Sequence, residues 1–147
     1  MMGFFRAASA AALLLALAIA PAGAAERHRL ALQMSDNDQA KMNAVLNVAA
    51  NVSKYYSDNG EEIEIEIVAF NAGLHMLRED TSPVKARLKS FKQGMPNVSF
   101  KACENTLDAM TRTEGKEPPL VPNAERVKAG VVTLIELAEK GWTIVRP

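Results

Sequence analysis

The thiol of Cys103 carries the most specific chemistry in this sequence, which contains no other cysteine. Residues 98–102 predict a strand and residues 105–112 a short helix, so the thiol is expected where the strand ends and the helix begins. The unpaired amides and the dipole of a helix N-terminus favour the thiolate, which is the reactive form. Glu104 opposes this effect with its negative charge, so we expect only modest activation. The alternative is a small, buried structural cysteine.

Two further loops are expected near this cysteine. Ligands of open α/β sheets bind beyond the C-terminal ends of the strands, where the strand order reverses. Residues 35–38, 71–73 and 103–106 are such ends, and they share a rim if their strands are neighbours. Asn105 and Thr106 can donate hydrogen bonds to a sulfur or a bound anion, or can cap the helix. The candidate binding residues are Asn37, Asp38, Asn71, Gly73, Asn105 and Thr106.

No metal or cofactor site is expected. His28 and His75 are too separate for a recognisable metal set, and no cysteine or carboxylate joins either at ligand spacing. The glycine-rich motifs for dinucleotides and nucleoside triphosphates and the G-x-S-x-G motif of serine hydrolases are absent from the sequence. A Cys–His pair for acyl transfer would need one of the two histidines beside Cys103.

Composition disfavours nucleic acid as a partner. The sequence has 17 Lys+Arg against 17 Asp+Glu and 48% hydrophobic residues. It therefore offers no broad positive field for binding phosphates. Lys85, Lys89 and Lys92 fall on one side of a predicted helix, which favours a solvated helix face over an anion site.

Residues 1–25 have the pattern of a secretory signal peptide. Arg6 precedes an apolar run over residues 7–20, and Ala22 and Ala24 give the small-residue spacing of a cleavage site. The alternative, a membrane anchor, needs about 20 apolar residues. We therefore expect an exported, periplasmic protein with no membrane segment after cleavage, in which residues 26–147 form a single domain. A lone thiol cannot form an intrachain disulfide.

Hydrophobic spacing predicts alternating strands and helices. Strands are expected at 29–34, 61–70, 98–102, within 120–128, and at 142–145. Helices are expected over 39–57, from Ser82-Pro83 onward, over 105–112, and over 131–140, which we expect to be heavily buried; residues 113–119 form a loop. This order predicts a three-layer α/β/α fold with a mostly parallel sheet of about five strands.

Two predicted strands depart from the pattern of a fully buried sheet. Residues 63–66 and 98–101 alternate apolar with polar side chains, whereas strands covered on both faces are almost continuously apolar. Part of one sheet face is therefore expected to be exposed to solvent in the isolated subunit or covered by another subunit.

These segments together resemble the small exported members of the DsrE/DsrF-like family over most of residues 26–147. The resemblance rests on Ser-Asp-Asn-Asp at 35–38, on residues 65–69 with Gly73 behind them, on Ala-Cys-Glu-Asn-Thr-Leu at 102–107, and on residues 130–147. It implies the three-layer fold, trimers or hexamers, and, as in some members, a cysteine that carries persulfide sulfur in relay reactions. Cys103 is the matching position.

Two functions follow as hypotheses. In the first, Cys103 binds sulfane sulfur from a donor and transfers it to an acceptor protein. In the second, the protein is a non-catalytic oligomeric module that binds a small ligand or partner, and Cys103 only packs. Fold alone does not decide between them.

Overall fold

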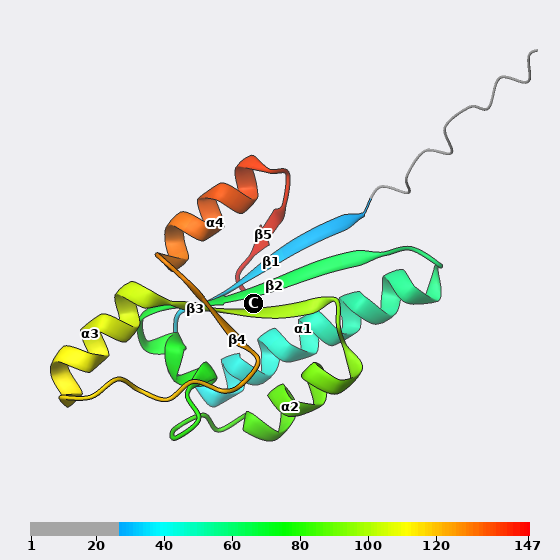
Figure 1. Cartoon of the computed structure of the whole chain (residues 1–147). Helices are drawn as coiled ribbons and strands as arrows, with labels where there is room; N and C mark the ends of the chain where they lie inside the picture. Colours follow the sequence, from blue (N-terminus) through cyan, green and yellow to red (C-terminus); the bar gives the residue numbers. More distant parts are fainter. Residues whose placement is uncertain (1–26) are drawn as a thin grey trace, which may run out of the picture.

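The computed structural model describes residues 27–147, which form a five-stranded, all-parallel sheet with helices on both faces (Figure 1). The strands are β1 (His28–Met34), β2 (Ile63–Ala69), β3 (Val98–Cys103), β4 (Ala124–Val127) and β5 (Thr143–Val145). Their order in the sheet is β4-β3-β2-β1-β5. The α/β class and three-layer architecture predicted from the sequence are confirmed. The predicted signal peptide, residues 1–25, lies outside the described residues.

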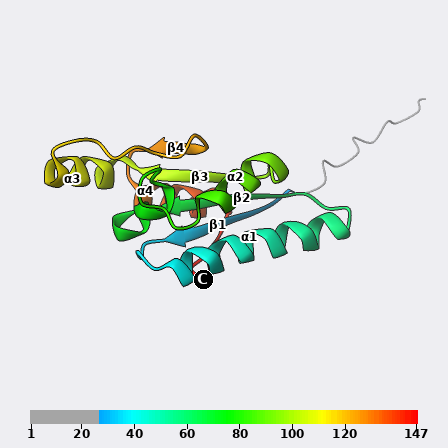
Figure 2. The same cartoon turned by 90° about the horizontal axis from the view of Figure 1, so that it is seen from below.

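The strand order explains how the helices divide between the two faces. The chain adds β2, β3 and β4 on one side of β1 and then returns to place β5 on the other side. Because parallel crossovers are right-handed, the returning connection crosses the opposite face. The helices are α1 (Gln39–Asp58), α2 (Lys85–Gly94), α3 (Glu104–Glu114) and α4 (Gly130–Glu139), with a 3₁₀ helix, η1 (Asn71–Leu77). Figures 1 and 2 both show α3 extending beyond the ends of the central strands.

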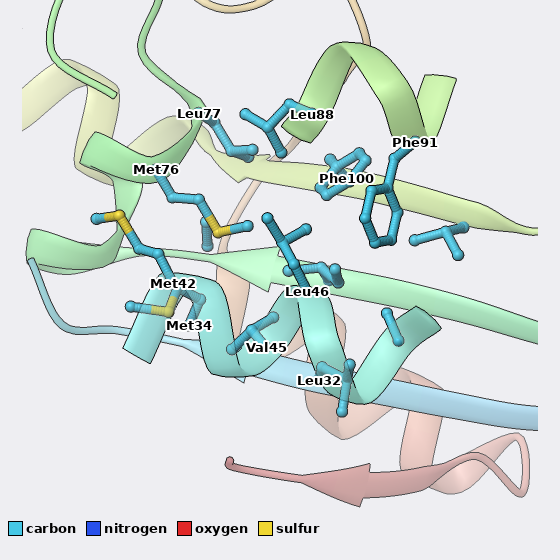
Figure 3. Packing of buried hydrophobic residues seen from close by; sticks show 14 of the residues in the cluster. Leu32, Met34, Met42, Val45, Leu46, Met76, Leu77, Leu88, Phe91 and Phe100 are labelled. Atoms are coloured by element: carbon cyan, nitrogen blue, oxygen red, sulfur yellow. The ribbon is translucent and has the colours of Figure 1, made fainter. Parts of the chain in front are cut away.

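The larger core lies between the sheet and the helices α1 and α2. Alternate side chains of the three central strands meet apolar side chains of both helices, and Leu32, Leu46 and Phe100 are at most 1% exposed. Figure 3 shows these side chains pointing toward one another from the strands and the helices. Asp38 fixes the start of α1, because its carboxylate accepts a hydrogen bond from the Lys41 amide at 2.8 Å.

The opposite face carries a smaller core and is only partly covered. Side chains of α4 pack there against alternate residues of the central strands, in a cluster made of Ala31, Val68, Phe70, Cys103, Leu134, Leu137 and Trp142. Toward the other end of the strands the same face holds Glu64, Glu66, Ser99 and Lys101, all half-buried. Burial raises the pKa of the Glu66 carboxyl above its usual value. This open region is the one that the alternating strand pattern predicts.

Two details of the sequence-based predictions are wrong. Helix α4 is not heavily buried, because Val131, Val132 and Ile135 are each slightly more than half exposed. Its apolar residues surround the helix, while the single chain covers only the side that faces the sheet. Helix α2 begins at Lys85 rather than at Ser82-Pro83, because residues 82–84 form a turn in which the Val84 amide donates to the Ser82 hydroxyl at 3.3 Å.

Candidate functional site

Cys103 is the last residue of β3 and the N-cap residue of α3. It lies on the face of the sheet that α4 covers, and the residue is 5% exposed. The backbone N–H of Gly130, the first residue of α4, donates a hydrogen bond to Sγ over an N–S distance of 3.2 Å. The sulfur is therefore buried and has a defined hydrogen-bond partner.

One helix N-terminus donates a hydrogen bond to this sulfur, and a second helix begins at the next residue without a capping hydrogen bond to the Cys103 side chain. Helix α3 begins at the next residue in the chain, and α4 begins at the residue that donates to Sγ. The amides of a helix N-terminus carry a partial positive charge and stabilise an anion placed there. This arrangement suits a sulfur that carries negative charge during a reaction, either as a thiolate or as the terminal sulfur of a persulfide.

A cavity of about 520 Å³ gives access to the cysteine. Phe70, Met110, Val131 and Val132 supply much of its apolar lining, and Asn105 stands at its exposed edge. A volume of this size is in the range that holds a small ligand or a short chain segment. Although Cys103 is buried, it lines a cavity and is not enclosed by packed hydrocarbon on all sides.

The wall of the cavity formed by η1 is held in place by two close contacts. A Cβ added at Gly73 would lie 2.2 Å from the carbonyl oxygen of Met34, so only glycine lets η1 approach the end of β1 this closely. Asn71 has a positive φ of 49°, and its amide donates to the hydroxyl of Thr106 in α3 at 2.9 Å. These contacts fix η1 against both β1 and α3.

A buried arginine joins η1 to the far end of α3. The guanidinium of Arg78 donates to both carboxylate oxygens of Asp80, at 2.9 and 2.8 Å, and to both of Glu114, at 2.6 and 2.9 Å. These hydrogen bonds lower the pKa of Asp80 to about 2 and that of Glu114 below its usual range. Glu114 also lines the cavity. Because Arg78 holds the Glu114 carboxylate, the arginine fixes the position of this part of the cavity wall.

Three of the six predicted binding residues line the cavity with Cys103. They are Asn71, Asn105 and Thr106. The Thr106 hydroxyl accepts from the Asn71 amide, so it organises the wall. Gly73 supports the same wall from behind and does not line the cavity.

The other two predicted binding residues lie at the end of β1, outside this lining. Asn37 is exposed, and Asp38 caps α1.

The two histidines lie at opposite ends of β2. His28 stacks on Tyr56 at a centroid distance of 4.1 Å and contacts the carboxylate of Glu61. His75 lines the Cys103 cavity, and its Nδ1 is 2.8 Å from the hydroxyl of Thr81. The histidine that a Cys–His pair would require in this cavity is therefore His75.

Sequence reasoning did not identify Gly130 as part of the site. It follows Cys103 by 27 positions and reaches the sulfur because β4 pairs in parallel with β3, which brings the chain back to the same end of the sheet. No local motif encodes that contact.

Within residues 27–147, no group of three or more His, Cys, Asp or Glu side chains is placed to hold a metal ion. None of the helices in this range combines the length and the apolar character needed to cross a membrane.

The fold and the site define an α/β protein with a buried thiol at a helix-lined cavity. No protein-family model matches the sequence, and no curated protein matches it. Among solved structures, the chain is similar to a protein of unknown function, MTH1491 from Methanobacterium thermoautotrophicum, with 25% identity and a TM-score of 0.69. The match covers 82% of this chain and 99% of that chain, and the two proteins share the α/β fold.

Proposed function

We propose that this protein is a DsrE-like sulfur carrier in which Cys103 accepts sulfane sulfur and passes it to an acceptor thiol. The observation that carries the proposal is the position of Sγ, which lies beside a cavity of about 520 Å³ and accepts a hydrogen bond from the first amide of α4. A thiol with only a packing role needs neither the cavity nor the amide. The resemblance of residues 102–107 to the family motif supports the same assignment.

The transfer balances without an external oxidant or reductant. The Cys103 thiolate attacks the outer sulfur of a donor persulfide, an S–S bond forms at Cys103, and the donor's S–S bond breaks. The donor leaves as a thiolate and takes up a proton. An acceptor thiolate then attacks the terminal sulfur on Cys103, which releases the Cys103 thiolate. The Gly130 amide stabilises the negative charge on Sγ at the start and the end of this cycle.

Mass spectrometry tests the proposal directly. The protein is incubated with glutathione persulfide, and we expect the mass of one or more sulfur atoms at Cys103 and none in the Cys103→Ser variant. An acceptor thiol added afterwards removes the added mass. If Cys103 is alkylated by iodoacetamide under the same conditions but takes up no sulfur, the proposal is wrong.

The exposed side of α4 supports a homo-oligomer, which we propose as a trimer or hexamer. Val131 and Val132 line the Cys103 cavity and are also half exposed on this side. Ile135 on α4 and Ile144 on β5 extend the apolar surface. A second copy of the chain bound there would cover the apolar residues next to the cavity.

The same surface favours the second candidate function, an oligomeric module that binds a small ligand or partner in the cavity without transferring sulfur. Unchanged assembly and unchanged cellular activity of the Cys103→Ser variant would support this module over the sulfur carrier. We place the mature protein in the periplasm on the signal-peptide pattern of residues 1–25, and cell fractionation tests that placement.

A further inference from the structure

A second cavity lies between α2 and the segment before β4. Its volume is about 730 Å³. One wall is α2, which presents Lys85, Lys89 and Lys92, and the other is the chain segment 121–123. The cavity shares no lining residue with the Cys103 cavity, so it is a separate feature of the surface.

The two walls differ in charge. Lys85 lies 4.0 Å from the carboxylate of Glu79, whereas Lys89 and Lys92 take part in no ion pair within residues 27–147. The opposite wall, Val121, Pro122 and Asn123, carries no charge. Glu79 also lines the cavity beside Lys85, so the unpaired positive charge of the groove lies at Lys89 and Lys92 and faces an uncharged, largely apolar wall.

The uncharged wall is fixed to the helix. The side-chain amide of Asn123 donates to the carbonyl oxygen of Leu88 at 3.2 Å. Leu88 and Val121 are buried at the base, 1% and 4% exposed. The groove is thus formed before any ligand binds, which lowers the entropic cost of binding.

We propose that this groove binds an extended, acidic segment of a partner protein in which carboxylate side chains alternate with apolar ones. Along the axis of α2, Lys85 and Lys89 are separated by about 6 Å and Lys89 and Lys92 by about 4.5 Å, and flexible lysine side chains can adjust to a somewhat longer repeat. Side chains on one side of an extended chain repeat at about 6.6 Å. Carboxylates on one side of the segment then face the lysines, while its apolar residues face Val121 and Pro122.

The helix wall of the groove is long enough for such a segment. Helix α2 has ten residues and is therefore about 15 Å long. Five residues of extended chain span about 17 Å. A small molecule with a single carboxylate would contact one lysine and leave the rest of the α2 wall without a ligand contact.

Other polyanions fit the groove less well. Nucleic-acid binding requires phosphate neutralisation over a wide basic surface, and this sequence has equal numbers of positive and negative side chains. An anionic membrane is a broad surface that meets protruding cations, whereas these lysines line one wall of a cavity.

Fluorescence anisotropy with a labelled peptide of alternating Glu and Val tests the proposal. We expect saturable, salt-sensitive binding that the Lys89→Gln/Lys92→Gln double variant weakens about tenfold, since the loss of each exposed charge pair weakens binding about threefold. The matched control, Lys116→Gln/Lys128→Gln, removes the same charge from exposed lysines outside the groove. It is expected to bind within about twofold of the wild type.

A second variant tests the uncharged wall. Pro122→Glu places a carboxylate at an exposed position opposite the lysines, and we expect it to weaken binding of the same peptide. Equal binding by the wild type and the Lys89→Gln/Lys92→Gln variant would overturn the proposal. A second outcome also overturns it. In that outcome the wild type does not bind the peptide but binds phosphatidylglycerol vesicles or an oligoribonucleotide, and the Lys89→Gln/Lys92→Gln variant loses that binding.

Discussion

The backbone N–H of Gly130 donates to Sγ of Cys103 across a distance of 3.2 Å, although the two residues are 27 positions apart in the chain. The contact joins the end of β3 to the start of α4. Any movement of α4 therefore changes the surroundings of the sulfur. The chemistry of the thiol thus depends on the helix that covers the second face of the sheet.

The Gly130→Ala substitution tests this dependence. A Cβ at this position would lie 3.0 Å from Cβ and Cδ1 of Phe70, so α4 and the buried Phe70 ring must move apart by a few tenths of an ångström, and we expect the N–H···S contact to lengthen. Hydrogen bonds to charged groups contribute about 1.5–3 kcal/mol, and we expect the alkylation rate of Cys103 at neutral pH to fall about tenfold. Iodoacetamide kinetics followed by mass spectrometry measure this rate.

A matched control is available in α2. A Cβ added at Gly94 meets nothing within 4 Å, so Gly94→Ala leaves the site unchanged and the alkylation rate at its wild-type value. A wild-type rate for Gly130→Ala, with the protein folded, contradicts a role of the amide.

Gly73→Ala is expected to be strongly destabilising. The added Cβ would lie 2.2 Å from the Met34 carbonyl oxygen and 2.7 Å from the Ser35 amide nitrogen, and backbone atoms at the end of β1 cannot move aside without disturbing the sheet. We expect a loss of at least about 2–3 kcal/mol in the free energy of unfolding, measured by urea denaturation. A variant that is as stable as Gly94→Ala would show that η1 is free to move away from β1.

The sequence allowed the elements and the end of β3 to be predicted because those features are local. The apolar alternation in residues 63–67 marks β2, and the turn residues at 35–38 mark the start of α1, where Asp38 caps the helix. The prediction that Cys103 ends one strand and precedes a helix is confirmed for the same reason.

The rest of the site could not be predicted because it depends on tertiary placement. The sequence alone does not show which strands are neighbours, so it makes Asn71 and Asp38 equally good candidates for binding residues. In the structure, only Asn71 lines the cavity, whereas Asp38 caps α1. The apolar residues of α4 predict burial on all sides, yet one chain covers only the side of this helix that packs on the face of the sheet.

The stability of the protein is expected to fall in acid through the hydrogen bonds of Arg78. The folded-state pKa of Asp80, about 2, is below its usual value of 3.8. The contribution of the ionised Asp80 carboxylate to the stability of the fold is therefore complete above about pH 4 and is lost as the pH falls through about 2. The carboxyl of Glu114, whose pKa is also lowered, adds to the loss in the same direction.

Urea midpoints between pH 6 and pH 2 measure this effect. The Asp80→Asn variant is less stable than the wild type at pH 6, and the difference narrows toward pH 2 because the wild-type carboxylate becomes protonated there. Asp58→Asn, which removes an exposed carboxylate paired only with exposed Lys54, serves as the control. A difference between Asp80→Asn and wild type that stays constant with pH would contradict the assignment.

The apolar surface of α4 predicts that Ile135→Lys separates the subunits without unfolding them. Ile135 is 53% exposed in the single chain and does not line the Cys103 cavity. A lysine there is solvated in the monomer but would place a charge in an apolar contact between copies. Sedimentation velocity is expected to give a trimer or hexamer for the wild type and a monomer with an unchanged circular dichroism spectrum for the variant. Tyr55→Lys, at a position on α1 that is 64% exposed, is expected to assemble as the wild type does. A monomeric wild type, or a variant that still assembles, would show that this surface does not join copies of the chain.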